Sequence, residues 1–355
     1  MIKIKKNTKI YIISPFHNTG GPKSLHQLAN VLKNEGYNVF IVYCNFDGSI
    51  YPTNELLYKD YTINISTKIE DNLENILITS EYNSGIQLQY KKIQKVIWWL
   101  SLDFYLNKKI FYSAKLTIMR KNYPSVVMPL VIIKIFLQRI GKKKYYQLIN
   151  KEDFKRIYHM YNCEYVHEFL KKNNVQEDNM HYFCGPLENS YINISPKEII
   201  AMKKDIVAYN PKKMDMRIFN KVQKYIEKKD NSIEFVAIQK MSRNKVYETL
   251  MSAKVYLDLG FFPGPERMPR EAVSLYCNII TSNKGSASNN IDVAIPKKYK
   301  FATKSNNVEK IGDLIVDMIK NYNNYILDFD TYRENVKNQI LRFNKDILNI
   351  FKEHI

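Results

Sequence analysis

A carboxylate and two arginines lie within five positions of each other, after a loop rich in glycine and proline. Arg267 is followed by Arg270 and Glu271, which open a helix expected over 270–276. A carboxylate at the start of a helix can accept two hydrogen bonds from a ribose diol, and such charge-assisted bonds are strong. Guanidinium groups bind phosphate oxygens. The spacing therefore indicates a site for a nucleotide diphosphate, although Glu271 also fits a first-turn residue that only complements the helix dipole.

Other residues that could bind this nucleotide lie in neighbouring loops. Lys212 and Lys213 follow a strand expected over 205–209, and their charge would suit a diphosphate. Only 9 of the 54 Lys and Arg residues are arginines, so a given lysine is more easily explained as a surface residue than Arg267 or Arg270 is. The loops that follow the later strands add three further candidates for the same site, which are Gly264, Glu266 and Ser286.

The first half of the chain offers a second possible phosphate site. A buried strand expected over 9–14 passes through a loop into a helix over 23–34. Gly20 and Gly21 lie at this junction, where bare backbone amides could approach a phosphate. A plain tight turn is the alternative explanation.

Candidate catalytic residues follow from the same strand pattern. Strands expected over 75–79 and 95–100 end just before Glu81 and Asp103, and His17 lies in the glycine-containing loop. Ligand sites of α/β proteins lie at the carboxyl ends of parallel strands. Each of the three could act as a base, and each is also consistent with a structural role.

Short apolar strands alternate with amphipathic helices through both halves of the chain. This order predicts an α/β protein with two doubly wound, Rossmann-like domains that face each other across a cleft. We expect the first domain over 1–190 and the second, nucleotide-binding domain over 200–325, joined by a polar linker from Pro186 to Lys197. A C-terminal helix over 326–355 would pack back on the first domain.

The stretch 253–287 resembles the donor-binding segment of GT-B glycosyltransferases, those of family four in particular. In that family, a strand leads into an E-G-F-G-L-x-x-x-E-A loop and helix, then a turn, a strand and a T-x-x-G-G-like loop. Residues 269–272 (P-R-E-A) fall on the second half of the first motif, and 275–281 cover the turn and strand. Gly20-Gly21 is similar to the acceptor-side loop, and 209–213 stand where the family carries a basic phosphate-binding pair. The segments W-W-L-S, Y-N-P-K-K and R-M-P-R-E-A resemble proteins of bacterial polysaccharide clusters.

The resemblance implies a hexosyltransferase that moves a sugar from a nucleotide-sugar to a saccharide or lipid-linked acceptor. It implies surface-polysaccharide synthesis, such as lipopolysaccharide or capsule, retention of the anomeric configuration, and no metal or cofactor. One departure is Pro263, which stands where the family carries its first Glu, a contact of the donor sugar; Glu266 could take its place. Two alternatives are a GT-B-like protein that binds a nucleotide-sugar without turnover and a nucleotide-sugar epimerase.

The composition bears on partners and compartment. The net charge is +19, which fits a lysine-coated surface or attraction to phosphates or an anionic membrane. No arginine-rich stripe or recognition motif predicts nucleic-acid binding. The four cysteines are scattered, which favours the cytoplasm, and no Asp-x-Asp at a strand end or histidine cluster predicts a metal site.

One apolar segment suggests a membrane contact. Residues 126–140 are mostly aliphatic or aromatic, and Lys142, Lys143, Lys144, Tyr145 and Tyr146 follow. The run is shorter than the roughly 18 apolar residues of a spanning helix. The pattern is typical of an interfacial segment, peripheral on the inner face of the cell membrane. The alternative is a hydrophobic helix buried against the first sheet.

Overall fold

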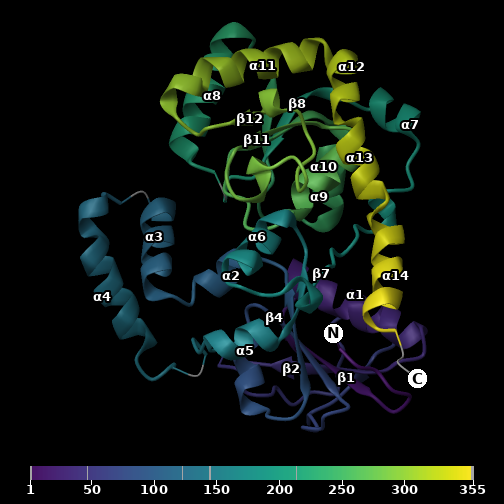
Figure 1. Ribbon diagram of the computed structural model, residues 1–355. Helices are drawn as coiled ribbons and strands as arrows, with labels where there is room; N and C mark the ends of the chain where they lie inside the picture. The colour runs from purple at the N-terminus through teal and green to yellow at the C-terminus, as the bar shows by residue number, and fades with distance from the viewer. Residues whose placement is uncertain (1, 46, 122, 144, 213, 353–355) are drawn as a thin grey trace. The chain divides into compact units, whose positions relative to one another are not determined.

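The chain forms two β-sheets of parallel strands, and each sheet lies in its own structural unit (Figure 1). The computed structural model describes residues 2–45, 47–121, 123–143, 145–212 and 214–352. Unit 1 comprises Met1–Asn162, Val166–Gly185 and Phe343–Ile355, and unit 2 comprises Cys163–Tyr165 and Pro186–Arg342. The predicted α/β class with two doubly wound domains is confirmed.

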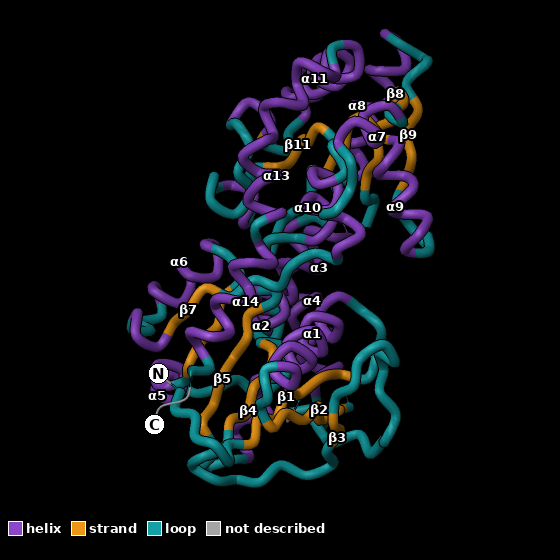
Figure 2. The backbone as a smooth tube through the Cα atoms, turned by 90° about the vertical axis from the view of Figure 1, so that its right-hand side faces the viewer, coloured by secondary structure: helices purple, strands orange, loops and turns teal. Residues whose placement is uncertain are grey.

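The sheet of unit 1 has seven strands in the order β3-β2-β1-β4-β5-β6-β7, and every neighbouring pair is parallel (Figure 2). Its chain order reverses between β1 and β4, which is where α/β sheets open a ligand crevice. The strands are β1 (Lys9–Pro15), β2 (Asn38–Cys44), β3 (Asn64–Ile65), β4 (Ile76–Ser80), β5 (Gln94–Trp99), β6 (Tyr158–Tyr161) and β7 (Met180–Tyr182).

In the described part of the chain, six α-helices precede the long unit 2 segment that begins at Pro186, and the first two residues of the sixth fall in unit 2. Helix α1 begins at Gly20, three residues earlier than expected, so the two glycines form its first turn instead of a preceding loop. The helices are α1 (Gly20–Asn34), α2 (Leu102–Leu106), α3 (Ile110–Lys121), α4 (Met128–Arg139), α5 (Lys151–Arg156) and α6 (Glu164–Lys172).

The core of unit 1 is closed by the C-terminal end of the chain. Phe343 and Ile347 are buried in the same cluster as Ile10 and Ile12 of β1. The Phe343 ring stacks on Phe183, with 4.7 Å between the ring centroids. The last helical turns therefore complete the apolar core of unit 1.

The sheet of unit 2 has five parallel strands in the order β12-β11-β10-β8-β9. Here the chain order reverses between β8 and β10, so the loops after these two strands flank the crevice. The strands are β8 (Lys204–Tyr209), β9 (Glu234–Ala237), β10 (Ala253–Asp258), β11 (Asn278–Ser282) and β12 (Lys300–Phe301). The helices are α7 (Pro196–Ala201), α8 (Met216–Lys229), α9 (Arg243–Ser252), α10 (Arg267–Ser274), α11 (Val308–Lys320), α12 (Tyr322–Tyr325), α13 (Asp330–Lys337) and α14 (Gln339–Ile350).

Two local expectations in unit 2 are wrong. Helix α10 begins at Arg267 rather than at residue 270, because Pro269 falls in the first turn, where a missing N–H costs nothing. Glu271 therefore lies in the second turn, not at the helix N-terminus. The stretch from Pro186, expected to be a linker, instead packs on unit 2, where Leu187 and Tyr191 are buried in the core.

The expected apolar segment forms the helix α4, which lies beside α3 at the left of Figure 1. Val131 and Ile135 are buried in a small cluster that they share with Ala114 and Ile118 of α3. The helix thus packs on α3 and not, as in one of the two expectations, against the sheet. No helix in the described part of the chain is long and apolar enough to cross a bilayer.

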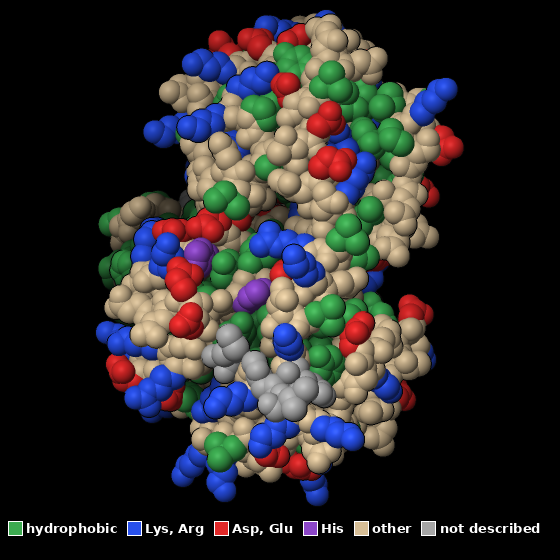
Figure 3. All heavy atoms as spheres, turned by 45° about the vertical axis from the view of Figure 1, so that its right-hand side comes forward, with side chains coloured by type: hydrophobic (Ala, Val, Ile, Leu, Met, Phe, Trp, Pro, Cys, Tyr) green, Lys and Arg blue, Asp and Glu red, His purple; other side chains and the backbone are tan. Residues whose placement is uncertain are grey.

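The positive charge is spread over the molecular surface. In Figure 3, lysine and arginine side chains are scattered over the visible face, with acidic side chains between them. Several form exposed ion pairs, such as Lys5 with Glu74 and Lys229 with Asp313. This distribution fits a lysine-coated surface for most of the charge.

Candidate functional site

A pocket of about 430 Å³ opens at the carboxyl ends of β1, β4 and β5 in unit 1. It lies where the chain order of the sheet reverses, so its position is the one expected for a ligand site. We call it the unit 1 pocket. It is lined by Pro15, His17, Thr19, Gly20, Gly21, Pro22, Leu25, Ser80, Glu81, Tyr82, Leu100, Ser101 and Phe104.

The first turn of α1 forms one wall of the unit 1 pocket. Backbone N–H groups in the first turn of a helix have no partners within the helix. No acidic side chain lies in this turn, and the N-cap residue Thr19 makes no side-chain capping bond. A Cβ added at Gly21 would lie 3.7 Å from Leu100 Cδ1, an ordinary contact, so packing does not demand glycine here. The first turn of α1 thus has backbone N–H groups available in the wall of the pocket, and a phosphate contact of Gly20 and Gly21 stays a prediction.

Glu81 lies in the wall of the unit 1 pocket and is only 1% exposed. Its Oε2 atom accepts a hydrogen bond of 2.7 Å from the backbone N–H of Leu100. Burial raises the pKa of this carboxyl to about 7, against the opposing effect of the Leu100 N–H and the positive charge of Lys108. A carboxyl with this pKa exchanges protons near neutral pH, which suits a general base.

Lys108 is a partner of Glu81 that sequence reasoning missed. It is buried, and burial lowers the pKa of its amine to about 8, while the Glu81 charge acts in the opposite direction. One lysine among 45 in the sequence carries no local signal of such a role. Only the fold of α2 and the following turn brings its charge to Glu81.

The two other predicted bases have different surroundings. His17 lines the unit 1 pocket, and its Nδ1 lies 3.0 Å from Thr19 Oγ1. Asp103 is buried in the first turn of α2, and its Oδ1 accepts a 2.6 Å hydrogen bond from the Tyr112 hydroxyl of α3. Among the described residues, Asp103 is not part of the pocket lining, so the structure brings His17 and Glu81 together but not Asp103.

In unit 2, Glu271 belongs to a cluster of alternating charges. Arg267 Nε lies 3.3 Å from Glu271 Oε1, one turn away on α10. The same arginine approaches Glu188 Oε1 at 3.7 Å, and Arg243 donates to that oxygen at 2.9 Å. The predicted pair Arg267 and Glu271 is therefore in contact. Sequence reasoning missed Glu188 and Arg243, and the scarcity of arginine was the one signal that could have drawn attention to Arg243.

Arg270 points into the protein rather than into this cluster. It is 6% exposed, and its Nε donates to the backbone carbonyl of Glu266 at 3.2 Å. One of its terminal nitrogens donates to Gln339 Oε1 at 2.6 Å. These bonds give Arg270 a role in fixing α10 to the start of α14.

The loops after β10 and β11 are joined to each other. The Ser286 hydroxyl donates to the Gly264 carbonyl at 2.5 Å, and the Ser286 N–H donates to the Phe262 carbonyl at 2.8 Å. Glu266 precedes α10 with a left-handed φ of 42°, a conformation that L-residues seldom adopt. Ser286 and Gly264, predicted as donor contacts, thus also hold the shape of the loop that leads to Glu266.

The remaining donor candidates follow β8 and β10. Lys212 is exposed, and its N–H donates to Asn210 Oδ1 at 3.1 Å. Lys213 lies outside the described residues. Pro263 is half-buried in the loop after β10. Within the described ranges, no group of three or more His, Cys, Asp or Glu side chains could hold a metal ion.

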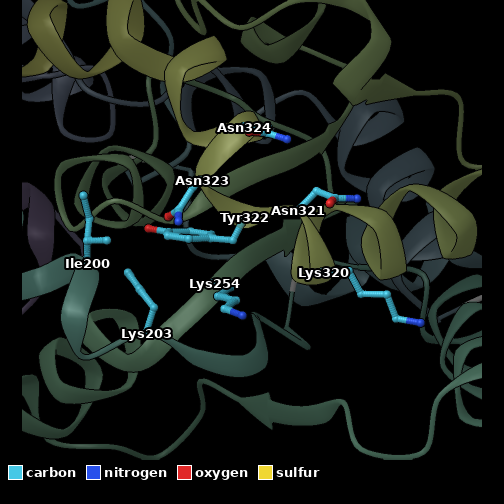
Figure 4. A pocket seen from close by; sticks show the side chains of 8 residues that line it. All are labelled: Ile200, Lys203, Lys254, Lys320, Asn321, Tyr322, Asn323 and Asn324. Atoms are coloured by element: carbon cyan, nitrogen blue, oxygen red, sulfur yellow. The ribbon is translucent and has the colours of Figure 1, made fainter.

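Another pocket, of about 420 Å³, lies in unit 2 at the amino ends of its strands (Figure 4). Its three lysines already have partners. Lys203 donates to the carbonyls of Leu250 and Ala253, Lys254 to Asp205, and Lys320 pairs with Asp230. The three lysines of this pocket therefore hold together parts of unit 2, and the pocket lies at the edge of the sheet opposite the predicted donor-binding loops.

Solved glycosyltransferase structures match the fold along nearly the whole chain. A glycosyltransferase from Rickettsia africae ESF-5 superposes with a TM-score of 0.60 at 11% identity and covers 98% of each chain. HepE from Anabaena, solved with UDP-glucose, gives a TM-score of 0.56 at 10% identity, over 97% of this chain and 99% of HepE. The chain has the GT-B fold.

A third GT-B neighbour extends the range of known activities on this fold. Sucrose-phosphate synthase from Thermosynechococcus elongatus superposes with a TM-score of 0.54 at 11% identity, over 97% of this chain and all of that one. No protein-family model matches the chain, and no curated protein matches its sequence. At 10–11% identity, the similarity establishes the GT-B fold only, and the substrates must be inferred from the chemistry of the site.

Proposed function

We propose that this GT-B protein is a glycosyltransferase that moves a sugar from a nucleotide-sugar to a saccharide or lipid-linked acceptor in surface-polysaccharide synthesis. The observation that carries the proposal is the match over 97% of the chain to HepE, a structure with UDP-glucose bound. The presence of Arg267 and Glu271 together on α10, in contact with each other, supports a nucleotide site in unit 2.

Glu271 would bind the ribose of the donor. Its Oε1 is paired with Arg267, and its side chain is only 12% exposed. The pairing orients the carboxylate, and hydrogen bonds from diol hydroxyls to a carboxylate are charge-assisted and strong. Arg267 and the exposed Lys212 would then neutralise the diphosphate, whose charge grows as the sugar leaves.

Glu81 would act on the acceptor. On the face of the sugar from which the diphosphate leaves, the acceptor oxygen forms a bond to the anomeric carbon as the bond from that carbon to the diphosphate oxygen breaks. Glu81 takes the proton of the acceptor hydroxyl. A base with a pKa near 7 can accept this proton at neutral pH. The family resemblance supports retention at the anomeric carbon and a reaction that needs no metal or cofactor.

The cytoplasm is the compartment that we propose. All four cysteines, Cys44, Cys163, Cys184 and Cys277, are buried and lie outside any disulfide. Reduced thiols in this number suit a reducing environment.

A second candidate is a GT-B protein that binds a nucleotide-sugar without turnover. The observation in its favour is Pro263, which occupies the position of the family's first carboxylate in the loop after β10. Glu266, three residues further on and held at a left-handed φ, is the residue that would replace that carboxylate in an active enzyme.

One experiment in two stages tests both candidates. A panel of nucleotide-sugars is screened by thermal shift, because a ligand of the native state raises the melting temperature with concentration. Nucleoside diphosphate release is then followed with saccharide and lipid-linked acceptors, with and without EDTA, and NMR assigns the anomeric product. No shift with any donor contradicts the transferase, and a shift without release favours the binding protein.

A further inference from the structure

The segment 104–140, which holds the end of α2 and the α3–α4 hairpin, is the most apolar exposed part of the described structure. Of the seventeen large hydrophobic side chains that are exposed there, ten lie within this stretch. The most exposed residues on the two helices are Phe111, Leu130, Ile133, Phe136 and Leu137, each between 54% and 68% exposed. Soluble surfaces rarely gather so many, and such patches mark interaction sites.

The inner face of the hairpin is already filled by its own side chains. Val131 and Ile135 of α4 pack against Ala114 and Ile118 of α3 in a separate small cluster. The exposed residues therefore form an outer apolar face in addition to the one that joins the two helices. The two helices lie side by side in Figure 1, and the side chains of the outer face are exposed in the described chain.

The charged residues in this segment and in the ten residues after it are all basic. Residues 104–150 contain eight lysines and two arginines and no Asp or Glu, although the whole chain has 35 acidic residues in 355. Lys109, Lys115, Lys134, Lys142 and Lys143 are all exposed. A surface that combines exposed apolar side chains with basic and no acidic ones is complementary to anionic headgroups above acyl chains.

We propose that the α3–α4 hairpin docks this protein on the surface of an anionic lipid bilayer. The exposed apolar side chains of both helices enter the boundary between headgroups and acyl chains, and the lysines contact anionic headgroups. Arg139 anchors the end of α4, because its guanidinium donates to the carbonyls of Lys108 and Asn107. This docking goes beyond the proposed function and does not depend on turnover.

The hairpin also connects to the unit 1 pocket. Phe104 both lines the pocket and is 53% exposed, and its ring packs on Tyr82 with 5.8 Å between centroids. The Tyr82 hydroxyl is hydrogen-bonded to Tyr145, just after the hairpin. A docked hairpin would thus hold the pocket near the headgroups, where the acceptor would be a lipid-linked saccharide. This last step alone rests on the proposed function.

Vesicle flotation of the full chain, without donor or acceptor, tests the docking. We expect the protein to float with vesicles of equal parts phosphatidylglycerol and phosphatidylcholine, and at least about tenfold less with phosphatidylcholine alone. The double variant Ile133→Glu, Phe136→Glu should lose at least about tenfold of the binding, since two apolar side chains no longer enter the bilayer. Both sites are exposed, so the fold should persist, which circular dichroism checks.

The matched control is Leu73→Glu, Ile291→Glu, which makes the same change at side chains that are 70% and 69% exposed elsewhere. It should float like the unchanged protein. Equal flotation of the Ile133, Phe136 variant, or no flotation of the unchanged protein, overturns the docking. A dimer in light scattering that this variant abolishes, without vesicle binding, would assign the face to a second copy instead. Because the test uses no nucleotide-sugar, its failure leaves the proposed transferase standing.

Discussion

Arg267 and Glu271 face each other across one turn of α10, with the arginine Nε 3.3 Å from the glutamate Oε1. Glu188 approaches the same guanidinium at 3.7 Å, so Arg267 lies between two carboxylates. A diphosphate would compete for this guanidinium and leave Glu271 available to a diol. In the proposed site, one turn of α10 would thus supply a contact for the diphosphate and a contact for the ribose.

Glu271→Gln should weaken donor binding. A hydrogen bond to a charged group contributes about 1.5–3 kcal/mol, so the dissociation constant for the nucleotide-sugar should rise about 10- to 100-fold. Calorimetric titration with the donor found by thermal shift measures it. Glu309→Gln, the same change at an exposed residue of α11, is the control and should bind normally. An unchanged affinity in the Glu271 variant would remove this residue from the site.

Activity should depend on the protonation of Glu81. Burial raises its pKa to about 7, and a base must be ionised, so turnover should fall as the pH drops through about 7 and level off above it. Glu81→Gln should lower turnover by roughly 10²–10⁴-fold and remove this limb of the pH profile. Glu55→Gln, at an exposed carboxylate of the same unit, should leave the profile intact. A variant of Glu81 that keeps the limb would contradict the assignment.

Lys108 offers an independent check on the same group. Its positive charge lowers the pKa of Glu81, against the effect of burial. Lys108→Met should therefore move the midpoint of the pH–rate profile to higher pH than in the unchanged protein. The profile is measured as nucleoside diphosphate release at saturating donor. A midpoint that stays in place or moves to lower pH would show that another group titrates.

Gly285→Ala should destabilise unit 2 through the joined loops. Gly285 has a φ of 62°, and an added Cβ would lie 2.0 Å from the Phe262 carbonyl oxygen, so the loop must shift. We expect a loss of at least about 3 kcal/mol in the free energy of unfolding. Gly36→Ala, with a φ of 89° and nothing within 4 Å of the added Cβ, should cost only about 1 kcal/mol.

Denaturant unfolding followed by two probes separates these effects. Trp98 and Trp99, the only tryptophans, lie in unit 1, so their fluorescence follows unit 1, while far-UV circular dichroism follows both units. The Gly285 variant should shift the dichroism transition more than the fluorescence transition. Equal costs for the two glycine variants would mean that the loop can move away from the new side chain freely.

Much of the fold could be predicted because most strands are continuous apolar runs. Strands β1, β4 and β8 begin and end within one residue of their expected bounds. β1 and β4 are almost entirely buried, whereas β8 is buried only over residues 206–208. Strands β6 and β7 were not expected, because Tyr158-His159-Met160-Tyr161 and Met180-His181-Tyr182 are short and partly polar. Their strand character comes from the pairing of β6 with β5 and of β7 with β6, and no local sequence pattern predicts this pairing.

The candidate site could be predicted only where a local pattern marks it. His17, Gly20, Gly21 and Glu81 were expected from the ends of strands, and the fold gathers all four around one pocket. Lys108 and Glu188 were not predicted as site residues, because nothing in the neighbouring sequence distinguishes them from other charged residues. Arg270 was expected to bind phosphate, but its side chain is buried and donates to Gln339. Gln339 lies 69 residues further along the chain, so only tertiary packing brings the two side chains together.

Arg270→Met should measure how much this packing stabilises α10. The guanidinium is 6% exposed and donates to the Glu266 carbonyl and to Gln339, which would both lose a partner. We expect a loss of about 2–3 kcal/mol in the free energy of unfolding. Arg217→Met removes an arginine whose side chain is 63% exposed in its pair with Asp215, and should cost at most about 1 kcal/mol. Equal losses would contradict a structural role for Arg270, whereas weaker donor binding by the folded variant would assign it to the diphosphate as well.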